Sequence, residues 1–145
     1  MTDKTLSLLK ESGWREDRRM EISNYEDELK EEGYIVNDTI REFLRSFGGL
    51  KVIHPHHHVE TSKDEFYIDP KRAISKVYIE TVKEYEDRAS ESLVTVGICF
   101  REHMVILISH TGKMYAAYDE TLLKLGDTTI QGLVALCEGT GITGV

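Results

Sequence analysis

The chain has 145 residues, of which 40% are hydrophobic and 30% charged, a composition typical of a globular protein and not of a disordered one. Lysine and arginine number 18 against 26 aspartates and glutamates, and the net charge of −8 argues against direct binding to nucleic acid, whose phosphates require a basic surface. No apolar run approaches the ~20 residues of a membrane helix, and residues 1–4 lack the basic start of a secretory signal. We therefore expect a cytoplasmic protein, folded as one domain over residues 1–145, that binds neither nucleic acid nor membrane.

The first part of the chain is predicted to be mainly helical. Leucines over residues 5–12 favour a short helix that ends at a glycine and is followed by Trp14. Met20 and Ile22 alternate with polar residues, which predicts a brief strand. Asn24 is then expected to cap a second helix that ends before Gly33.

A third helix is predicted between Asn37, which can cap its first turn, and a Gly-Gly pair. Its apolar positions recur at helical spacing and include Ile40, Phe43, Leu44 and Phe47. Gly48 is expected to take the left-handed conformation that ends a helix, and Gly49 to allow close backbone packing. A strand over residues 50–53 follows at once, so the glycines form a structural corner. A nucleotide-binding turn would have the strand before the helix.

The second half changes to strands after one more helix. Residues 65–68 favour a strand, and Asp69-Pro70 is a strong helix start, predicting a helix that continues to Arg88. Helical spacing places Tyr78 on its apolar face, together with Ile74, Val77, Thr81, Val82 and Tyr85. The runs 93–100, 104–109 and 113–118 are separated by short links and are therefore expected to form an antiparallel three-stranded meander. The middle run is apolar without alternation, as expected of a central strand.

The end of the chain carries one more helical pattern. Thr128 or Thr129 opens a last helix, and residues 139–145 are expected to fray. The predicted fold class is thus α+β, an antiparallel sheet flanked by helices. Cys99 and Cys137 lie in apolar stretches and are expected to be buried thiols.

A histidine-rich segment offers the most obvious candidate for chemistry. His54, His56 and His58 would point to one side of an extended chain, with Glu60 in the same phase, and three imidazoles can bind zinc. A metal-dependent enzyme or sensor is therefore an alternative function. Against it, all these residues come from one loop, whereas preorganised sites usually draw ligands from several elements. We predict no metal site, no cofactor and no catalytic residue.

A cluster of acidic residues on the second helix is the candidate partner-binding site. Two like-charge pairs at i, i+4 spacing each cost roughly 0.2–0.5 kcal/mol, and acids near the C-terminal end also oppose the helix dipole. Because the helix keeps these charges despite the cost, they are candidates for binding a basic surface of another molecule. A solvent-exposed side of the helix that simply tolerates the charges explains them equally well. The residues are Glu26, Asp27, Glu28, Glu31 and Glu32.

The order of these landmarks resembles the SUKH superfamily, in particular its bacterial branch of small immunity proteins. The resemblance runs from Gly13 to Gly139, and each motif alone is short; their order and spacing carry it. The landmarks are Gly13-Trp14, Arg18, Phe47-Gly48-Gly49-Leu50, Phe66, Asp69-Pro70, Val96-Gly97, Ile106 to Gly112, Tyr115 and Leu123 to Gly126.

The resemblance implies a SUKH-like α+β protein that binds and neutralises a cognate toxin delivered between bacteria. Such toxins are often nucleases or other enzymes acting on nucleic acid, with basic clefts. The resemblance supplies no catalytic residues, so no enzymatic activity is expected. Related members act as interaction hubs, which leaves a scaffold domain as another alternative. The histidine segment and the acidic helix lie outside the shared landmarks.

Overall fold

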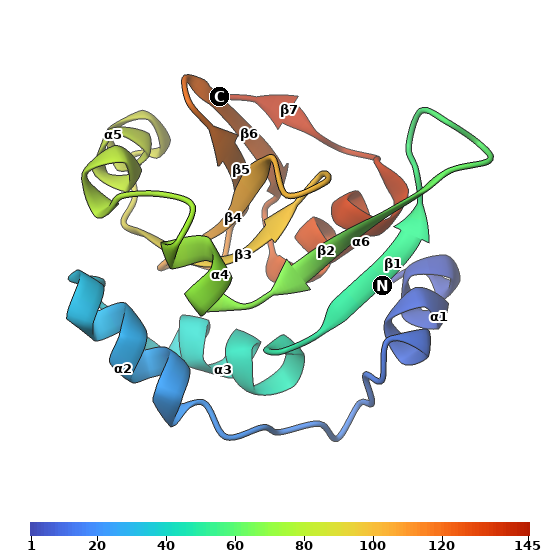
Figure 1. The fold of residues 1–145 in the computed structure, drawn as a ribbon, viewed down its shortest axis with the longest axis horizontal. Coiled ribbons are helices and arrows are strands. Elements are labelled where there is room, and N and C mark those ends of the chain that lie inside the picture. The colour runs from blue at the N-terminus through green and yellow to red at the C-terminus, as the bar shows by residue number, and fades with distance from the viewer.

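The computed structural model describes all residues 1–145 as six helices and one seven-stranded sheet (Figure 1). The elements follow in the order α1 (Asp3–Glu11), α2 (Ser23–Glu32), α3 (Asp38–Phe47), β1 (Lys51–Pro55), β2 (Lys63–Ile68), α4 (Pro70–Ile74), α5 (Ile79–Ala89), β3 (Leu93–Cys99), β4 (Met104–Ser109), β5 (Met114–Tyr118), β6 (Thr121–Gly126), α6 (Thr129–Glu138) and β7 (Thr143–Gly144).

The sheet is an antiparallel meander in which the strands lie side by side in chain order, from β1 to β7. The predicted α+β class and the three predicted strands β3, β4 and β5 are confirmed, and β4 is the central strand, buried along nearly its whole length. The meander is longer than predicted, because β6 continues it and β7 pairs with β6. The prediction of a frayed tail was therefore wrong for Thr143–Gly144, whose backbone pairs with β6.

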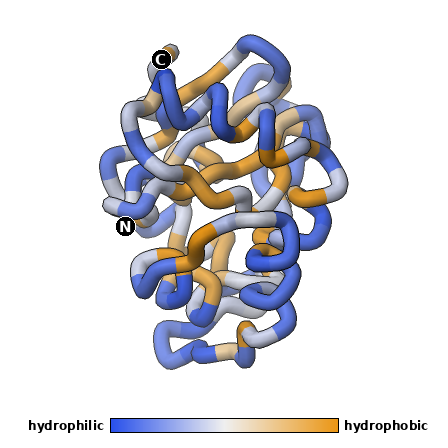
Figure 2. Tube along the Cα trace, turned by 90° about the vertical axis from the view of Figure 1, so that its left-hand side faces the viewer, coloured by the Kyte–Doolittle hydropathy of each residue, from blue (hydrophilic) through white to orange (hydrophobic).

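The sheet curves around α6. This helix contacts β1 at one end of the strand order and β5 and β6 near the other, which requires the sheet to bend toward it. α1 packs beside β1 and α6, while α4 and α5 pack against β3 (Figure 1). Hydrophobic segments lie mainly inside and hydrophilic ones mainly at the periphery (Figure 2), and the buried apolar side chains form one core.

Three predicted helix starts are confirmed by side-chain caps. The Asn37 side chain accepts a hydrogen bond from the Ile40 amide at 3.1 Å, and Thr128 accepts one from the Gln131 amide at 3.1 Å. Asp69 accepts one from the Lys71 amide at 3.0 Å, with proline at the first helical position. Each cap satisfies an amide that the helix itself leaves without an acceptor.

Two predictions near the second helix were wrong. Residues 20–22 form no strand, because the Met20 amide donates to the Arg45 carbonyl at the end of α3 and not to a neighbouring strand. Asn24 is not a cap either, since α2 already begins at Ser23. The Ser23 amide donates to the Glu21 carboxylate at 2.9 Å, so an upstream side chain satisfies it.

The helix predicted from Pro70 to Arg88 is two helices. α4 ends at Ile74, and Tyr78 takes an extended conformation (φ −77°, ψ 146°) before α5 begins. α4 packs against both α2 and β3, whereas α5 is attached to the turn between β5 and β6, and the break allows the two helices to run in different directions. The break also removes Tyr78 from the apolar face that helical spacing predicted, leaving it 80% exposed.

The Gly-Gly corner exists as predicted, but its two glycines exchange roles. Gly49 is the left-handed residue (φ +80°), whereas Gly48 is extended (φ −58°, ψ 142°). A Cβ at Gly48 would lie 2.5 Å from the Leu44 carbonyl oxygen, so Gly48 provides the close approach. The Gly49 amide then donates to the Ile68 carbonyl, which joins the corner to β2.

Trp14 and Arg18 complete this corner. The Trp14 ring stacks on Phe47 with centroids 5.6 Å apart, and its Nε1 donates to Ser46 Oγ at 3.2 Å. The Arg18 guanidinium donates to the carbonyls of Ser46 and Gly48, both at 2.8 Å, which satisfies acceptors at the C-terminal end of α3. The landmarks from the first third of the sequence thus meet at one place and fix where α3 turns into the sheet.

Candidate functional site

The histidine segment does not form a converging set of ligands. His54 is buried on β1 and its Nδ1 is 2.9 Å from the Pro55 carbonyl oxygen, while His56 Nδ1 accepts from the amides of His58 and Val59 in the loop. The chain leaves the strand after Pro55, so the three histidines of the predicted face do not stay in phase. No group of three histidine, cysteine, aspartate or glutamate side chains is placed to hold a metal ion.

His57, which the pattern did not include, is the one that contacts His54. Their ring centroids lie 5.1 Å apart, and His57 Nε2 is 2.9 Å from the Leu136 carbonyl oxygen of α6. Burial lowers the pKa of His54, which favours the neutral ring. This arrangement attaches the β1–β2 loop to the last helix and is structural.

The two cysteines are free and buried, as predicted. Burial raises the pKa of the Cys99 thiol well above its usual value and raises the pKa of Cys137 to about 12. Both thiols are therefore protonated at neutral pH and are poor nucleophiles.

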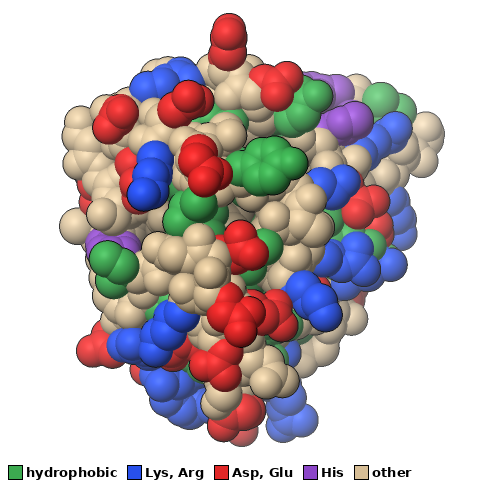
Figure 3. Space-filling model, turned by 60° about the vertical axis from the view of Figure 1, so that its left-hand side comes forward, with side chains coloured by type: hydrophobic (Ala, Val, Ile, Leu, Met, Phe, Trp, Pro, Cys, Tyr) green, Lys and Arg blue, Asp and Glu red, His purple; other side chains and the backbone are tan.

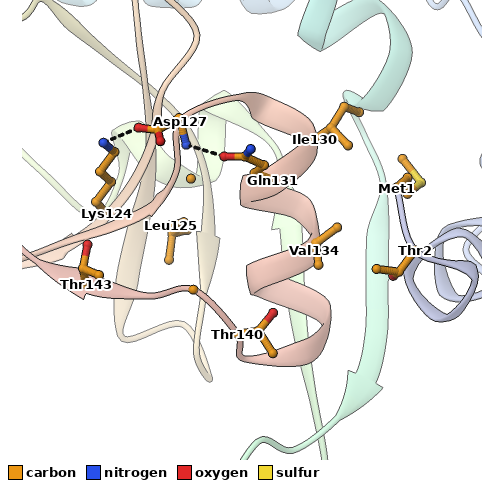
Figure 4. A pocket seen from close by; sticks show the side chains of 12 residues that line it. Met1, Thr2, Lys124, Leu125, Asp127, Ile130, Gln131, Val134, Thr140 and Thr143 are labelled. Atoms are coloured by element: carbon orange, nitrogen blue, oxygen red, sulfur yellow. Dashed lines mark hydrogen bonds and ion pairs between the residues drawn. The ribbon is translucent and has the colours of Figure 1, made fainter.

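A pocket of about 610 Å³ lies between the N-terminus, β6 and α6 (Figure 4). Its charged lining residues are Lys124 and Asp127, which form an ion pair with each other, and the Asp127 amide donates to the Gln131 side chain at 2.9 Å. The remaining side chains that line it are apolar or hydroxyl-bearing, among them Ile130 and Val134. The side chains of the pocket therefore present no unpaired acid or base to a substrate.

On the acidic helix α2, Glu26 is engaged inside the molecule. Its carboxylate accepts two hydrogen bonds from the Arg41 guanidinium, both at 3.0 Å, and lies 3.0 Å from Lys30 Nζ. Arg41 and Lys30 lower the pKa of Glu26 to about 2. The side chain is only 17% exposed, so Glu26 attaches α2 to α3.

The other four candidate residues of α2 have no ion-pair partner within the molecule. Asp27, Glu31 and Glu32 are exposed, and Glu28 is half-buried. α5 adds further exposed carboxylates without a partner, at Glu80, Glu84 and Asp87. Acidic side chains are accordingly numerous over α2 and α5 in Figure 3. We refer to the seven carboxylates of Asp27, Glu28, Glu31, Glu32, Glu80, Glu84 and Asp87 as the acidic face.

The end of α2 meets the start of α5 next to Tyr34 in the chain. This side chain is 7% exposed and its hydroxyl has no hydrogen-bond partner. Burial, followed by the charges of Glu32, Glu86 and Glu80, raises its pKa. A Cβ at Gly33 would lie 3.1 Å from Ile79 Cδ1, which places the end of α2 against the start of α5. The α5 half of this face is not predictable from the sequence, because no pattern in the chain shows that α2 and α5 meet.

The whole chain was compared with known proteins. The family model described as SUKH-3 immunity protein matches residues 1–139. The chain belongs to the SUKH-3 immunity protein family. A search of curated proteins and a search of solved structures each found no match.

Membership of the SUKH-3 family agrees with the α+β architecture and supports an immunity role. It also makes a protein toxin the implied partner of the chain. None of the helices combines the length and the apolar character needed to cross a bilayer.

Proposed function

We propose that this SUKH-3 protein is a cytoplasmic antitoxin that binds a cognate bacterial toxin domain and blocks it by occlusion, without catalysis. We further propose that the toxin acts on nucleic acid and presents a basic surface. The observation that carries the proposal is the acidic face: carboxylates without an ion-pair partner on two helices, α2 and α5, that meet where α2 ends and α5 begins.

The charge of this face fits a protein partner with a basic cleft. Complementary charges accelerate the encounter of two proteins, and an inhibitor that binds stoichiometrically needs no turnover chemistry. Exposed carboxylates that pair with nothing in the free protein lose no internal ion pair when they meet lysine or arginine on the partner. Glu26 would support this surface from behind, because its ion pairs hold α2 on α3.

Co-expression tests the proposed function directly. The C-terminal domain encoded by the neighbouring reading frame is expressed in bacteria with or without this chain. We expect growth to be lost with the domain alone and restored by the chain, and the two proteins to co-purify as a stoichiometric complex. Failure to restore growth together with the absence of a complex would refute an antitoxin role toward that domain.

Charge reversal tests the acidic face separately. The variant Glu28→Lys, Glu31→Lys, Glu32→Lys is expected to associate with the toxin domain at least several-fold more slowly at low salt, and the difference should shrink as salt screens the charges. The matched control is Glu16→Lys, Asp17→Lys, Glu60→Lys, which changes the net charge equally at exposed positions outside α2. Equal association rates for both triple variants would remove α2 from the interface.

A further inference from the structure

A second feature lies on the other side of α5: a groove of about 380 Å³ between this helix, the β3–β4 turn and the end of β5. Its lining includes Tyr85, Val105 and Ala117, all of which are buried. The Tyr85 hydroxyl donates to the Asp119 carbonyl at 2.7 Å, and Arg88 donates to the Glu120 carbonyl at 2.6 Å. These bonds hold α5 to the β5–β6 turn, so the groove is formed in the free protein.

Two tyrosines at this groove are unusually exposed. Tyr78 at the start of α5 is 80% exposed and Tyr118 at the end of β5 is 57% exposed, and both line the groove. Neither hydroxyl makes a hydrogen bond within the molecule, and no packing requirement of the fold explains aromatic rings at these two positions. Tyrosine is enriched among the residues that dominate binding energy at protein interfaces, because it buries a large rigid area at little entropic cost. We call this site the tyrosine groove.

The tyrosine groove holds one carboxylate without an ion-pair partner. Besides the tyrosines, the titratable side chains of its lining are Glu102, Asp119, Lys76 and His103. Glu102 pairs with Arg72 at 3.6 Å, whereas the exposed Asp119 carboxylate has no ion-pair partner within the molecule. Figure 3 shows hydrophobic side chains reaching the surface of this side of the molecule among acidic ones.

A cationic side chain matches this combination of groups. An arginine can stack its guanidinium on a tyrosine ring while donating to a carboxylate, and both interactions strengthen as water is excluded. A second copy of this chain is a poor occupant, because each copy carries a net charge of −8 and presents acids at the same place.

We propose that the tyrosine groove receives an arginine side chain projecting from the surface of the partner toxin, and that Tyr78 and Tyr118 are the principal binding residues of the interface. The inference rests on the proposed antitoxin function. It adds the place where the toxin binds, the tyrosine groove, and the chemical group that is bound there, a guanidinium. The acidic face would then accelerate the encounter, while the tyrosine groove would slow dissociation.

Binding measurements with the toxin domain of the neighbouring reading frame test this assignment. Tyr78→Ala and Tyr118→Ala are each expected to weaken the complex by about 30-fold or more, mainly through faster dissociation. Tyr78→Phe and Tyr118→Phe keep the ring and are expected to stay within about threefold of the parent chain. The matched control is Ile53→Ala, which truncates a 47% exposed apolar side chain on β1, outside the groove.

Charge and folding provide the second measurement. Asp119 has a positive φ of 49°, which asparagine tolerates, so Asp119→Asn removes the charge without altering the turn. We expect it to weaken binding about tenfold at low salt and less at high salt. Melting temperatures of all these variants should match that of the parent chain, because the altered groups are exposed.

The outcomes separate the two proposals. If the parent chain protects cells and binds the toxin, but Tyr78→Ala with Tyr118→Ala binds equally well, the tyrosine groove is refuted and the antitoxin function stands. If the parent chain neither protects nor binds, the antitoxin function fails and the inference fails with it. If sedimentation shows a dimer of the free chain that the tyrosine variants dissociate, the groove is a self-association site and the assignment to the toxin is overturned.

Discussion

The corner around Phe47 and the face formed by α2 and α5 differ in how their polar groups are used. At the corner, the Trp14 and Arg18 side chains are hydrogen-bonded within the protein, and Gly48 has no room even for a methyl group. On the face, carboxylates lie in solvent without partners, as do Tyr78 and Tyr118 in the neighbouring tyrosine groove. A stable fold requires its buried polar groups to form hydrogen bonds within the protein. Solvent-exposed polar groups without an internal partner are available to bind another molecule.

This difference explains why the landmarks identify the family but not the partner. The residues of the corner are required by any chain that turns from α3 into this sheet, so they mark the architecture. The acids of α2 and α5 and the tyrosines of the groove are not required by the fold. They are therefore the residues to which we assign the proposed recognition of the toxin.

The largest expected effect is at the corner. Phe47→Ala removes a buried ring that packs on both Trp14 and Phe43, and it should lower the free energy of unfolding by about 3–5 kcal/mol. Urea denaturation followed by tryptophan fluorescence measures this loss. Ile35→Ala, at a 75% exposed position, is the control and should change stability by less than about 0.5 kcal/mol. A loss below about 1 kcal/mol for Phe47→Ala would contradict a tightly packed corner.

A smaller effect is expected from Arg18→Met, which keeps the apolar stem but removes the donors to the Ser46 and Gly48 carbonyls. We expect a loss of about 2 kcal/mol, the range for hydrogen bonds from a charged donor. Arg15→Met is the matched control, because Arg15 is exposed and its one ion pair, with the equally exposed Asp17, is long at 3.8 Å. Similar losses for the two variants would show that the Arg18 hydrogen bonds contribute nothing specific.

The ion pairs of Glu26, which hold α2 on α3, should make the stability of the protein depend on pH in the acid range. The pKa of Glu26 is lowered from 4.5 to about 2, so its contribution to stability is present above about pH 4.5 and is lost as the pH falls toward 2. Glu26→Gln should therefore be less stable than the parent chain at pH 7 by about 1 kcal/mol, because the site is partly solvated, and the difference should shrink toward pH 2. Urea denaturation across this pH range measures it, with Glu60→Gln as the control. A constant difference at all pH values would exclude the ion pair as its cause.

The smallest effect is on the acidic face and has the opposite sign. Glu31→Lys with Glu32→Lys removes two like-charge pairs and places cations at the C-terminal end of α2. The free energy of unfolding should rise by about 0.5 kcal/mol at low salt. Thermal denaturation measures this gain, and it should fade as salt is added. Destabilisation would show that these carboxylates support the fold, and the contrast between the two regions would be lost.

Local chemistry made much of the fold predictable. Asn37, Asp69 and Thr128 cap helices through bonds to residues two or three positions away, so sequence spacing identifies them. β4 is recognisable from its unbroken apolar run. Contacts between distant elements decided the break before Tyr78, which allows α5 to reach the β5–β6 turn. The strand β6 was not predicted because its leucines, at 122, 123 and 125, do not alternate with polar residues.

The site was less predictable for the same reason. The acids of α2 stand out in the chain, but only the packed structure shows that Arg41 of α3 engages Glu26 and that α5 adjoins α2. The histidines illustrate the reverse case. Their alternation is conspicuous in the sequence, yet the strand ends at Pro55, so that His54 contacts His57 while His56 and His58 contact each other in the loop. The tyrosine groove has no sequence signal, since helical spacing places Tyr78 in the core.

The order of the strands in the sheet, which follows their order in the chain, has a consequence for how quickly the protein folds. Every strand pairs with the strand next to it along the chain, and four of the six connections are tight turns or short loops. Short connections keep the entropy of loop closure low, and chains rich in such local pairings fold fast. Newly synthesised copies would then reach the folded state soon after leaving the ribosome, which would suit the proposed task of binding a toxin before it acts.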